Sequence, residues 1–349
     1  MNAQTQYRAT AAAALVLTLM LAGCGGGGDG TTSTTTPTTT QPPAPVVDVY
    51  SYAPPAPTYA PGSYELAAFN LLNAERSRCG FGKLKQSVKL DQAARNHAQW
   101  IMLNNWTVSH TEQPGTPGFT GVIAEDRAFA VGYDGYVGEE AGAASKNDST
   151  TGNIGEAWIR LLLSTPLHGS GLVSPGYGSD VGIGFSDASP DPLWALFRAG
   201  DLLTGSLKSE WAADAQRAAS AYAPGEIKTY PCEGTVGIMT KIANEIPNPV
   251  PGRNLATNPT GGAIVVLSAP GTTLKLGGST LIHIASGASV PMRAGVTDGV
   301  GSVMNLGSDK GFYLPDVPLA PNARYQFTFS GTADGKPFTK TFSFETGPI

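Results

Sequence analysis

Apolar side chains recur every three or four residues in two stretches that follow residue 62. Leu66, Phe69 and Leu72 form the first stripe, and Ser63 precedes it as a residue type that caps helix N-termini. The same spacing continues from Leu90 to about Asn104, so a second helix is expected there. Two helices are therefore predicted to open the folded part of the chain.

Shorter patterns follow these two helices. Residues 154–163 are predicted to form a helix that stops before Pro166, because a proline ring disfavours a helical residue ahead of it. Strands are predicted at 180–186 and 193–199, where Gly and Pro flank short apolar runs. A helix or helical turn is expected at 211–223. This mixture of helices and strands predicts the α+β fold class.

The last hundred residues alternate apolar and polar side chains, which is the pattern of half-buried strands. Strands are predicted at 263–267 and 279–284. The dipeptide Asp334–Gly335 is a hairpin signal. Aromatic residues alternate on both sides of it, with Tyr325, Phe327 and Phe329 before the turn and Phe338, Phe342 and Phe344 after it. These regular short strands predict an all-β sandwich.

The size and composition of the chain suit two folded units with tails. The chain has 349 residues, more than one domain usually holds, and 41% of them are hydrophobic, which is enough to build cores. The net charge of −5 comes without a basic block, so no nucleic-acid partner is expected. Residues 25–61 are rich in Gly, Thr and Pro and are predicted to be a linker.

The N-terminal residues have the pattern of an export signal. The apolar run 11–22 is too short to span a bilayer, and the sequence Leu21-Ala22-Gly23-Cys24 resembles the bacterial lipobox. That resemblance implies cleavage before Cys24 and a lipid anchor on its thiol, so the membrane is an expected partner. The alternative is an ordinary signal peptide with an incidental cysteine. In a two-membrane bacterium, Gly25 rather than Asp after the cysteine would favour the outer membrane of the cell envelope.

Two further cysteines, Cys79 and Cys232, lie in the predicted folded part. An exported chain meets an oxidising compartment, so these two thiols are predicted to form a disulfide. The alternative is two separate buried thiols.

From residue 71 onward, short motifs follow one another in a defined order. They are Leu71-Leu72-Asn73-Ala74-Glu75-Arg76, Ser109-His110, Asp126-Arg127, Gly132-Tyr133, Gly138-Glu139, Ser164-Thr165-Pro166-Leu167-His168 and Val181-Gly182-Ile183-Gly184. Each motif alone is weakly specific. In this order they resemble the bacterial SCP-like branch of the CAP superfamily of cysteine-rich secretory, antigen 5 and pathogenesis-related proteins. The resemblance covers about residues 63–232.

The resemblance implies an α-β-α sandwich with a cleft lined by His and Glu. On the family's pattern, His110 is the first cleft histidine, Glu139 is the glutamate of a Gly-Glu-Asn turn, and His168 is the histidine of a Ser-Pro-x-His turn. Glu156 is a further candidate for the cleft. Two imidazoles and a carboxylate could bind a divalent cation such as zinc with one open position, or form a metal-free polar network.

Several departures from the family's pattern leave the task of this cleft open. Glu140 stands where the family has Asn, and residues 181–185 lack the histidine that the eukaryotic branch adds as a fourth cleft residue. No Gly-x-Ser-x-Gly nucleophile motif is present. The expected function is binding of a small apolar ligand, an envelope component or a cation. The alternatives are an envelope hydrolase in which His110 and Glu139 activate water, and a structural or adhesive surface protein in which these residues brace loops.

The C-terminal strands resemble bacterial Ig-like envelope domains, on the segment 318–325 and the final Phe-Ser-Phe-Glu-Thr. This module is interpreted as a spacer or an adhesive unit. The predicted organisation is a signal peptide at 1–23, a lipidated cysteine and linker at 24–62, a CAP domain at 63–232, a connector at 233–255 and an Ig-like β-sandwich at 256–349.

Overall fold

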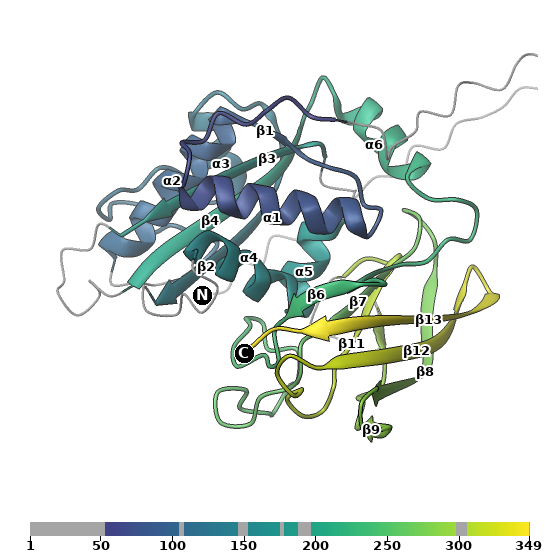
Figure 1. Ribbon diagram of the computed structural model, residues 1–349. Helices are drawn as coiled ribbons and strands as arrows, with labels where there is room; N and C mark the ends of the chain where they lie inside the picture. The colour runs from purple at the N-terminus through teal and green to yellow at the C-terminus, as the bar shows by residue number, and fades with distance from the viewer. Residues whose placement is uncertain are drawn as a thin grey trace, which may run out of the picture. The chain divides into compact units, whose positions relative to one another are not determined.

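A computed structural model describes residues 53–104, 108–145, 153–174, 178–187, 197–297 and 306–348. The fold is α+β, as predicted, and the described residues belong to one compact unit (Figure 1). Cys24 lies outside the described residues, together with the predicted signal peptide and most of the predicted linker. None of the helices described combines the length and the apolar character needed to cross a membrane.

Six helices occur among the described residues. They are α1 (Tyr64–Arg78), α2 (Val88–Leu103), α3 (Ala124–Ala130), α4 (Ile154–Leu163), α5 (Pro166–Val173) and α6 (Trp211–Ser220). The first sheet has the strand order β1 (Lys85–Gln86), β3 (Asp180–Ser186), β4 (Phe197–Leu207) and β2 (Gly135–Ser145). Strands β1 and β3 run parallel, and the other neighbours are antiparallel.

Helices cover both faces of this first sheet. On β4, Leu203 packs in a cluster with Leu90 and Ala94 of α2, whereas its neighbour Leu202 packs in the cluster that holds residues of α1, α4 and α5. Successive side chains of a strand point to opposite faces, so α2 and α3 lie on one side and α1, α4 and α5 on the other (Figure 1). Gly142 of β2 lies against Trp158 of α4, which agrees with this division.

The local signals for α1 are confirmed. Ser63 caps the helix, and its hydroxyl accepts a hydrogen bond from the Leu66 amide at 3.1 Å. Gly80 and Gly82 follow the helix with positive φ angles of 78°, a conformation that costs glycine little. A strong local signal was therefore enough to predict where this helix begins.

Two segments differ from the prediction in ways that matter for the site. Gly138, Glu139 and Glu140 were expected in a turn, but they lie inside β2, which pairs with β4 along its whole length. His168 was also expected in a turn, and it lies in α5. This helix begins at Pro166, because proline suits the first helical position, where no N–H donor is needed.

The C-terminal part consists of two sheets. One has the order β10 (Val296–Thr297), β11 (Lys310–Tyr313), β7 (Ile264–Leu267) and β5 (Lys228–Tyr230). The other has the order β6 (Thr235–Ile238), β13 (Lys336–Thr346), β12 (Arg324–Ala333), β8 (Leu274–His283) and β9 (Ala288–Val290). Strands β5 and β6 come from the residues before 256, so these sheets take up chain from the end of the predicted first domain and from the connector.

The aromatic alternation predicted for the last strands is confirmed. Tyr325, Phe327 and Phe329 of β12 are at most 2% exposed, and Tyr313 of β11 contacts two of these rings edge to face. Asp334 and Gly335 form the predicted hairpin turn, both with positive φ.

The predicted disulfide is present. Cys79, which follows α1, and Cys232, which lies between β5 and β6, are bonded, with Cα atoms 5.5 Å apart and a sequence separation of 153. The bond ties the end of the first helix to the start of the C-terminal sheets.

Candidate functional site

His110 and Glu139 lie together, as the family resemblance implied. The Nδ1 atom of His110 is 2.9 Å from Oε2 of Glu139. The histidine side chain is 55% exposed, whereas that of Glu139 is only 5% exposed. A buried carboxylate therefore orients an exposed imidazole, and among the residues that the structure describes no group is bonded to Nε2 of that ring.

Arg127 of α3 holds this pair in place from inside the protein. Its Nη2 group donates to Oε1 of Glu139, and its Nη1 group lies 3.4 Å from the carbonyl oxygens of His110, Gly121 and Val122. The Arg127 side chain is fully buried. One guanidinium thus fixes both the carboxylate of the pair and the backbone of the loop that carries the histidine. We call His110, Glu139 and Arg127 the His110 site.

A second buried pair supports the same loop. His97 of α2 has Nδ1 at 3.0 Å from Glu112 and Nε2 at 2.8 Å from the Ser109 carbonyl oxygen. Both ring nitrogens lie within hydrogen-bond distance of oxygen atoms, so the imidazole links α2 to this loop on two sides. Glu112 also accepts from the amides of Thr120 and Gly121. His97 is therefore a structural residue that fastens this loop to α2.

The charges around Glu139 keep its carboxyl ionised. Burial raises the pKa of Glu139, but the hydrogen bond from His110 and the positive charge of Arg127 outweigh burial, and the net pKa lies below its ordinary value. The His110 ring consequently faces an anion on its Nδ1 side at neutral pH. That anion favours the tautomer with the proton on Nδ1 and leaves Nε2 available to a ligand or a water molecule.

Asp201 adds a fourth ionisable group that the sequence analysis did not single out. It lies on β4 directly opposite Ala141, on the same face as Glu139, and is completely buried. Neither carboxyl oxygen has a hydrogen-bond partner among the described residues. Burial raises the pKa of Asp201 well above its ordinary value, and the charge of Glu139 raises it further against the opposing effect of Arg127. Burial and the nearby Glu139 charge thus both favour the neutral form of Asp201.

Asp201→Asn should make the protein more stable than the wild type at neutral pH. Folding raises the pKa of this carboxyl above its value in the unfolded chain, which is about 4. The free energy of unfolding therefore falls as the pH rises from the unfolded-state pKa towards the folded-state pKa, by up to about 1.4 kcal/mol for each pH unit. An amide carries no such cost, so the advantage of the variant should grow from pH 5 to pH 8 in urea unfolding. Asp134→Asn, at an exposed position, is the control that should show no such growth. A constant difference across this range would contradict a raised pKa of Asp201.

His168 does not join the His110 site. Its Nδ1 atom lies 3.1 Å from Glu245 of the segment after β6, and the same Glu245 oxygen accepts from the Leu167 amide at 2.8 Å. Helix α5 lies on the face of the sheet opposite α2 and α3. The sheet thus separates His168 from His110, and His168 fastens the chain after β6 to the start of α5.

Glu140 and Glu156 also lie on this other side. Glu140 alternates with Glu139 along β2, so its side chain points to the opposite face, where it meets Gly171 of α5. Burial, and then the charges of Glu245 and Glu139, raise the pKa of Glu140 well above its ordinary value. Glu156 belongs to α4, which covers the same face. Among the described residues, no group of three or more His, Cys, Asp or Glu side chains is arranged to bind a metal ion.

Three buried residues of the His110 site and its surroundings were not recognised as functional candidates from the sequence. Arg127 belongs to the motif Asp126-Arg127, which by itself assigns it no role, and the sequence around Glu112 gives no indication of function because Glu112 lies in an irregular loop. The sequence does indicate a role for Asp201, because an acid in the middle of an apolar strand is unusual unless it has a specific role.

Comparison with known families agrees with the motifs. Residues 69–192 match the family described as CAP: Cysteine-rich secretory protein family. A search of curated proteins finds no match to the chain. The matched segment contains His110, Arg127, Glu139 and His168, whereas Asp201 and Glu245 lie beyond it. Residues 69–192 of this chain therefore belong to the CAP family of cysteine-rich secretory proteins.

Proposed function

We propose that this protein is a cell-envelope lipoprotein that binds a small apolar ligand bearing an oxygen acceptor at the His110 site. The observation that carries the proposal is the exposed Nε2 atom of His110, on a ring whose Nδ1 atom is fixed by a buried, ionised Glu139. A ring oriented in this way can donate a hydrogen bond to a carbonyl or carboxylate oxygen when it is protonated, and it can accept one when it is neutral.

Exposed apolar side chains beside His110 support an apolar ligand. Val122 and Ile123 are 37% and 45% exposed, and Phe119, on the same loop, is 37% exposed. The carbonyl oxygens of His110 and Val122 both lie 3.4 Å from the same nitrogen of Arg127, so the two backbones are neighbours. Apolar surface next to one oriented polar group is the usual composition of a ligand site.

A binding experiment with dodecanoate tests this proposal. His110→Ala should weaken dodecanoate binding about tenfold or more, because a charge-assisted hydrogen bond is lost. Val122→Ser should weaken it by a smaller factor, since apolar contact is reduced. Calorimetric titration of the purified protein measures both effects.

Ile246→Ser provides the matched control, because Ile246 is 74% exposed and lies outside the His110 site. Its affinity for dodecanoate should equal that of the wild type. Equal affinities of the wild type and His110→Ala would rule out a ligand held by this histidine. Absence of any saturable binding to the wild type would rule out an acyl ligand.

Hydrolysis is the second candidate function, and one observation favours it. The Glu139–His110 pair has the geometry of a carboxylate that orients a general base, with the reactive nitrogen facing solvent. If water is activated there, His110→Ala and Glu139→Gln should each reduce turnover of p-nitrophenyl butyrate by about 10²–10⁴-fold. Full turnover in the double variant would exclude this mechanism.

The proposal also includes three assignments for parts of the chain outside the His110 site. The layered first sheet is interpreted as the α-β-α sandwich of the family, the two C-terminal sheets as an Ig-like module, and Cys24 as the site of a lipid anchor. The helices on both faces of the first sheet and the aromatic packing between β11 and β12 support the first two. Mass spectrometry of the exported protein tests the third, since a lipidated N-terminal cysteine adds the mass of acyl chains.

A further inference from the structure

Two buried glutamates lie along one face of α5. Glu245, in the segment after β6, accepts hydrogen bonds from the amides of Leu167 and His168 at 2.8 and 3.3 Å. A Cβ added to Gly171 would lie 1.9 Å from Oε1 of Glu140, so this second carboxyl group rests directly on the helix backbone. Residues three or four apart share one face of a helix. The two carboxyl groups are therefore neighbours, about one helical turn apart.

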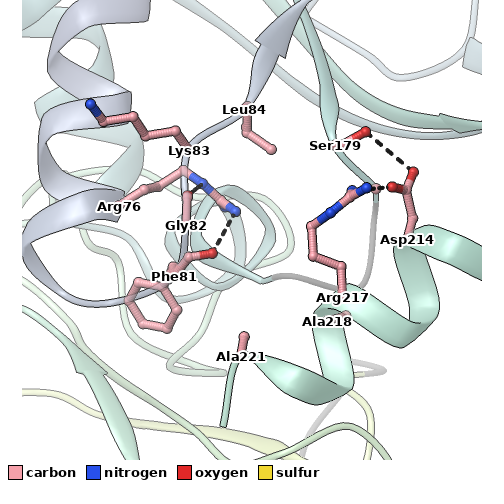
Figure 2. A pocket seen from close by; sticks show the side chains of 11 residues that line it. Arg76, Phe81, Gly82, Lys83, Leu84, Ser179, Asp214, Arg217, Ala218 and Ala221 are labelled. Atoms are coloured by element: carbon pink, nitrogen blue, oxygen red, sulfur yellow. Dashed lines mark hydrogen bonds and ion pairs between the residues drawn. The ribbon is translucent and has the colours of Figure 1, made fainter. Parts of the chain in front are cut away.

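One carboxyl oxygen of Glu245 has no hydrogen-bond donor. The side chain is completely buried, and Oε1 lies 3.1 Å from Nδ1 of His168, whereas Oε2 has no partner among the described residues. Asp214 shows a better-satisfied arrangement for a buried carboxylate, because Figure 2 shows it bonded to both Arg217 and Ser179. A buried carboxylate oxygen without a donor costs free energy. The interior beside α5 is therefore poorly suited to a second negative charge.

Glu140 would bring that second charge if it ionised. Burial and then the charge of Glu245 raise its pKa, so the neutral form is favoured. The ionisable groups on the elements packed around Glu140 are Glu245, His168 of α5, Lys310 of β11, Asp201 of β4, Glu139 on the other face of β2, and Glu156 and Arg160 of α4. The positive charge of Lys310 opposes the increase, and Arg160 is bonded to carbonyl oxygens of β6. A rising pH therefore sets two negative charges against each other here.

The contacts around this pair differ in their response to pH. The carbonyl oxygen of Ser164 accepts from the Ala263 amide at 2.7 Å, and its hydroxyl oxygen accepts from the Met239 amide at 3.3 Å. These bonds also join the segment 239–263 to the helices, and they contain no ionisable group. They remain when the pH rises, so only the contacts made by Glu245 at the start of α5 are expected to loosen.

We propose that Glu140, Glu245 and His168 form a pH-sensitive latch that holds the segment after β6 against α5 and loosens as the pH rises. Glu140 keeps its proton in the closed state and releases it more easily in the open state. The closed state is thus fully favoured below the ordinary glutamate pKa of about 4.3, and this advantage is lost as the pH rises towards the raised pKa. The latch requires no ligand and is independent of the His110 site.

Hydrogen exchange at the amides of Leu167 and His168 tests the latch, because both donate to Glu245. Exchange is measured from pH 5 to pH 8 in the wild type and in Glu140→Gln. The ratio of the wild-type rate to the variant rate should increase by up to about tenfold for each pH unit, because only the wild type gains a charge on opening. Glu245→Gln keeps an oxygen acceptor but removes the neighbouring charge, so its own exchange should depend less on pH than that of the wild type.

Glu125→Gln is the matched control, because this exposed glutamate of α3 carries the same charge and lies away from α5. The ratio of wild-type to variant rates should stay constant with pH for this control. A constant ratio for Glu140→Gln as well would overturn the latch. An unchanged pH dependence in Glu245→Gln would show that the two carboxyl groups do not interact. An equal increase at the amides of β12 would mean that Glu140 ionises only on global unfolding, which also contradicts a local latch.

Discussion

Arg127→Met should lower the free energy of unfolding by about 3–5 kcal/mol, because it leaves a buried carboxylate without its partner. Arg127 is fully buried and pairs with Glu139, whose side chain is 5% exposed. It also donates to three carbonyl oxygens of the loop that carries His110, and methionine can replace none of these bonds. Urea denaturation at pH 7 measures the loss.

The double variant Arg127→Met/Glu139→Gln separates the cost of the unpaired Glu139 carboxylate from the cost of the lost hydrogen bonds to carbonyl oxygens. Because the second change removes the unpaired charge, it should recover part of the lost stability, and the cycle gives the coupling between the two residues. Arg95→Met, at an exposed position, should stay within about 0.5 kcal/mol of the wild type. A loss of less than about 1 kcal/mol in Arg127→Met would show that the buried cluster does not depend on this guanidinium.

Removing the disulfide should have an effect of similar size. The bond between Cys79 and Cys232 closes a loop of 153 residues, for which the chain-entropy model gives about 4–5 kcal/mol and typical measured losses are about 2–5 kcal/mol. The double variant Cys79→Ser/Cys232→Ser should therefore unfold at a much lower urea concentration than the wild type without reductant.

Adding a reductant provides the internal control for this prediction. It should bring the wild type down towards the double variant and leave the variant unchanged, because only the wild type has a bond to reduce. Equal stability of the wild type and the variant without reductant would mean that the loop is already constrained by the packing around it.

Prediction from the sequence succeeded where the evidence was local. The cap Ser63 predicted the start of α1, and the short apolar runs predicted α4 and β3 with their observed bounds. The turn signal Asp334–Gly335 predicted the last hairpin. These features depend on dihedral preferences and on periodicity, which neighbouring residues impose on one another.

The composition of the His110 site could be predicted only in part. His110 and Glu139 were paired through motifs, and the structure brings them together. His168 was grouped with them because the family resemblance assigned all three to one cleft. The sheet lies between them instead, since β2 is a continuous strand and α5 packs on its other face.

What the sequence by itself determined is therefore the locally encoded elements, such as the start of α1, α4, β3 and the last hairpin, while the resemblance of its motifs implied the family and the grouping of His110 with Glu139. Only the tertiary structure decided which charges share a face of the first sheet. Alternation along β2 sends Glu139 to the side of Arg127 and Asp201, and Glu140 to the side of α5 and Glu245. A single residue of register separates these two environments, and register depends on strand pairing across the fold rather than on neighbours in the chain.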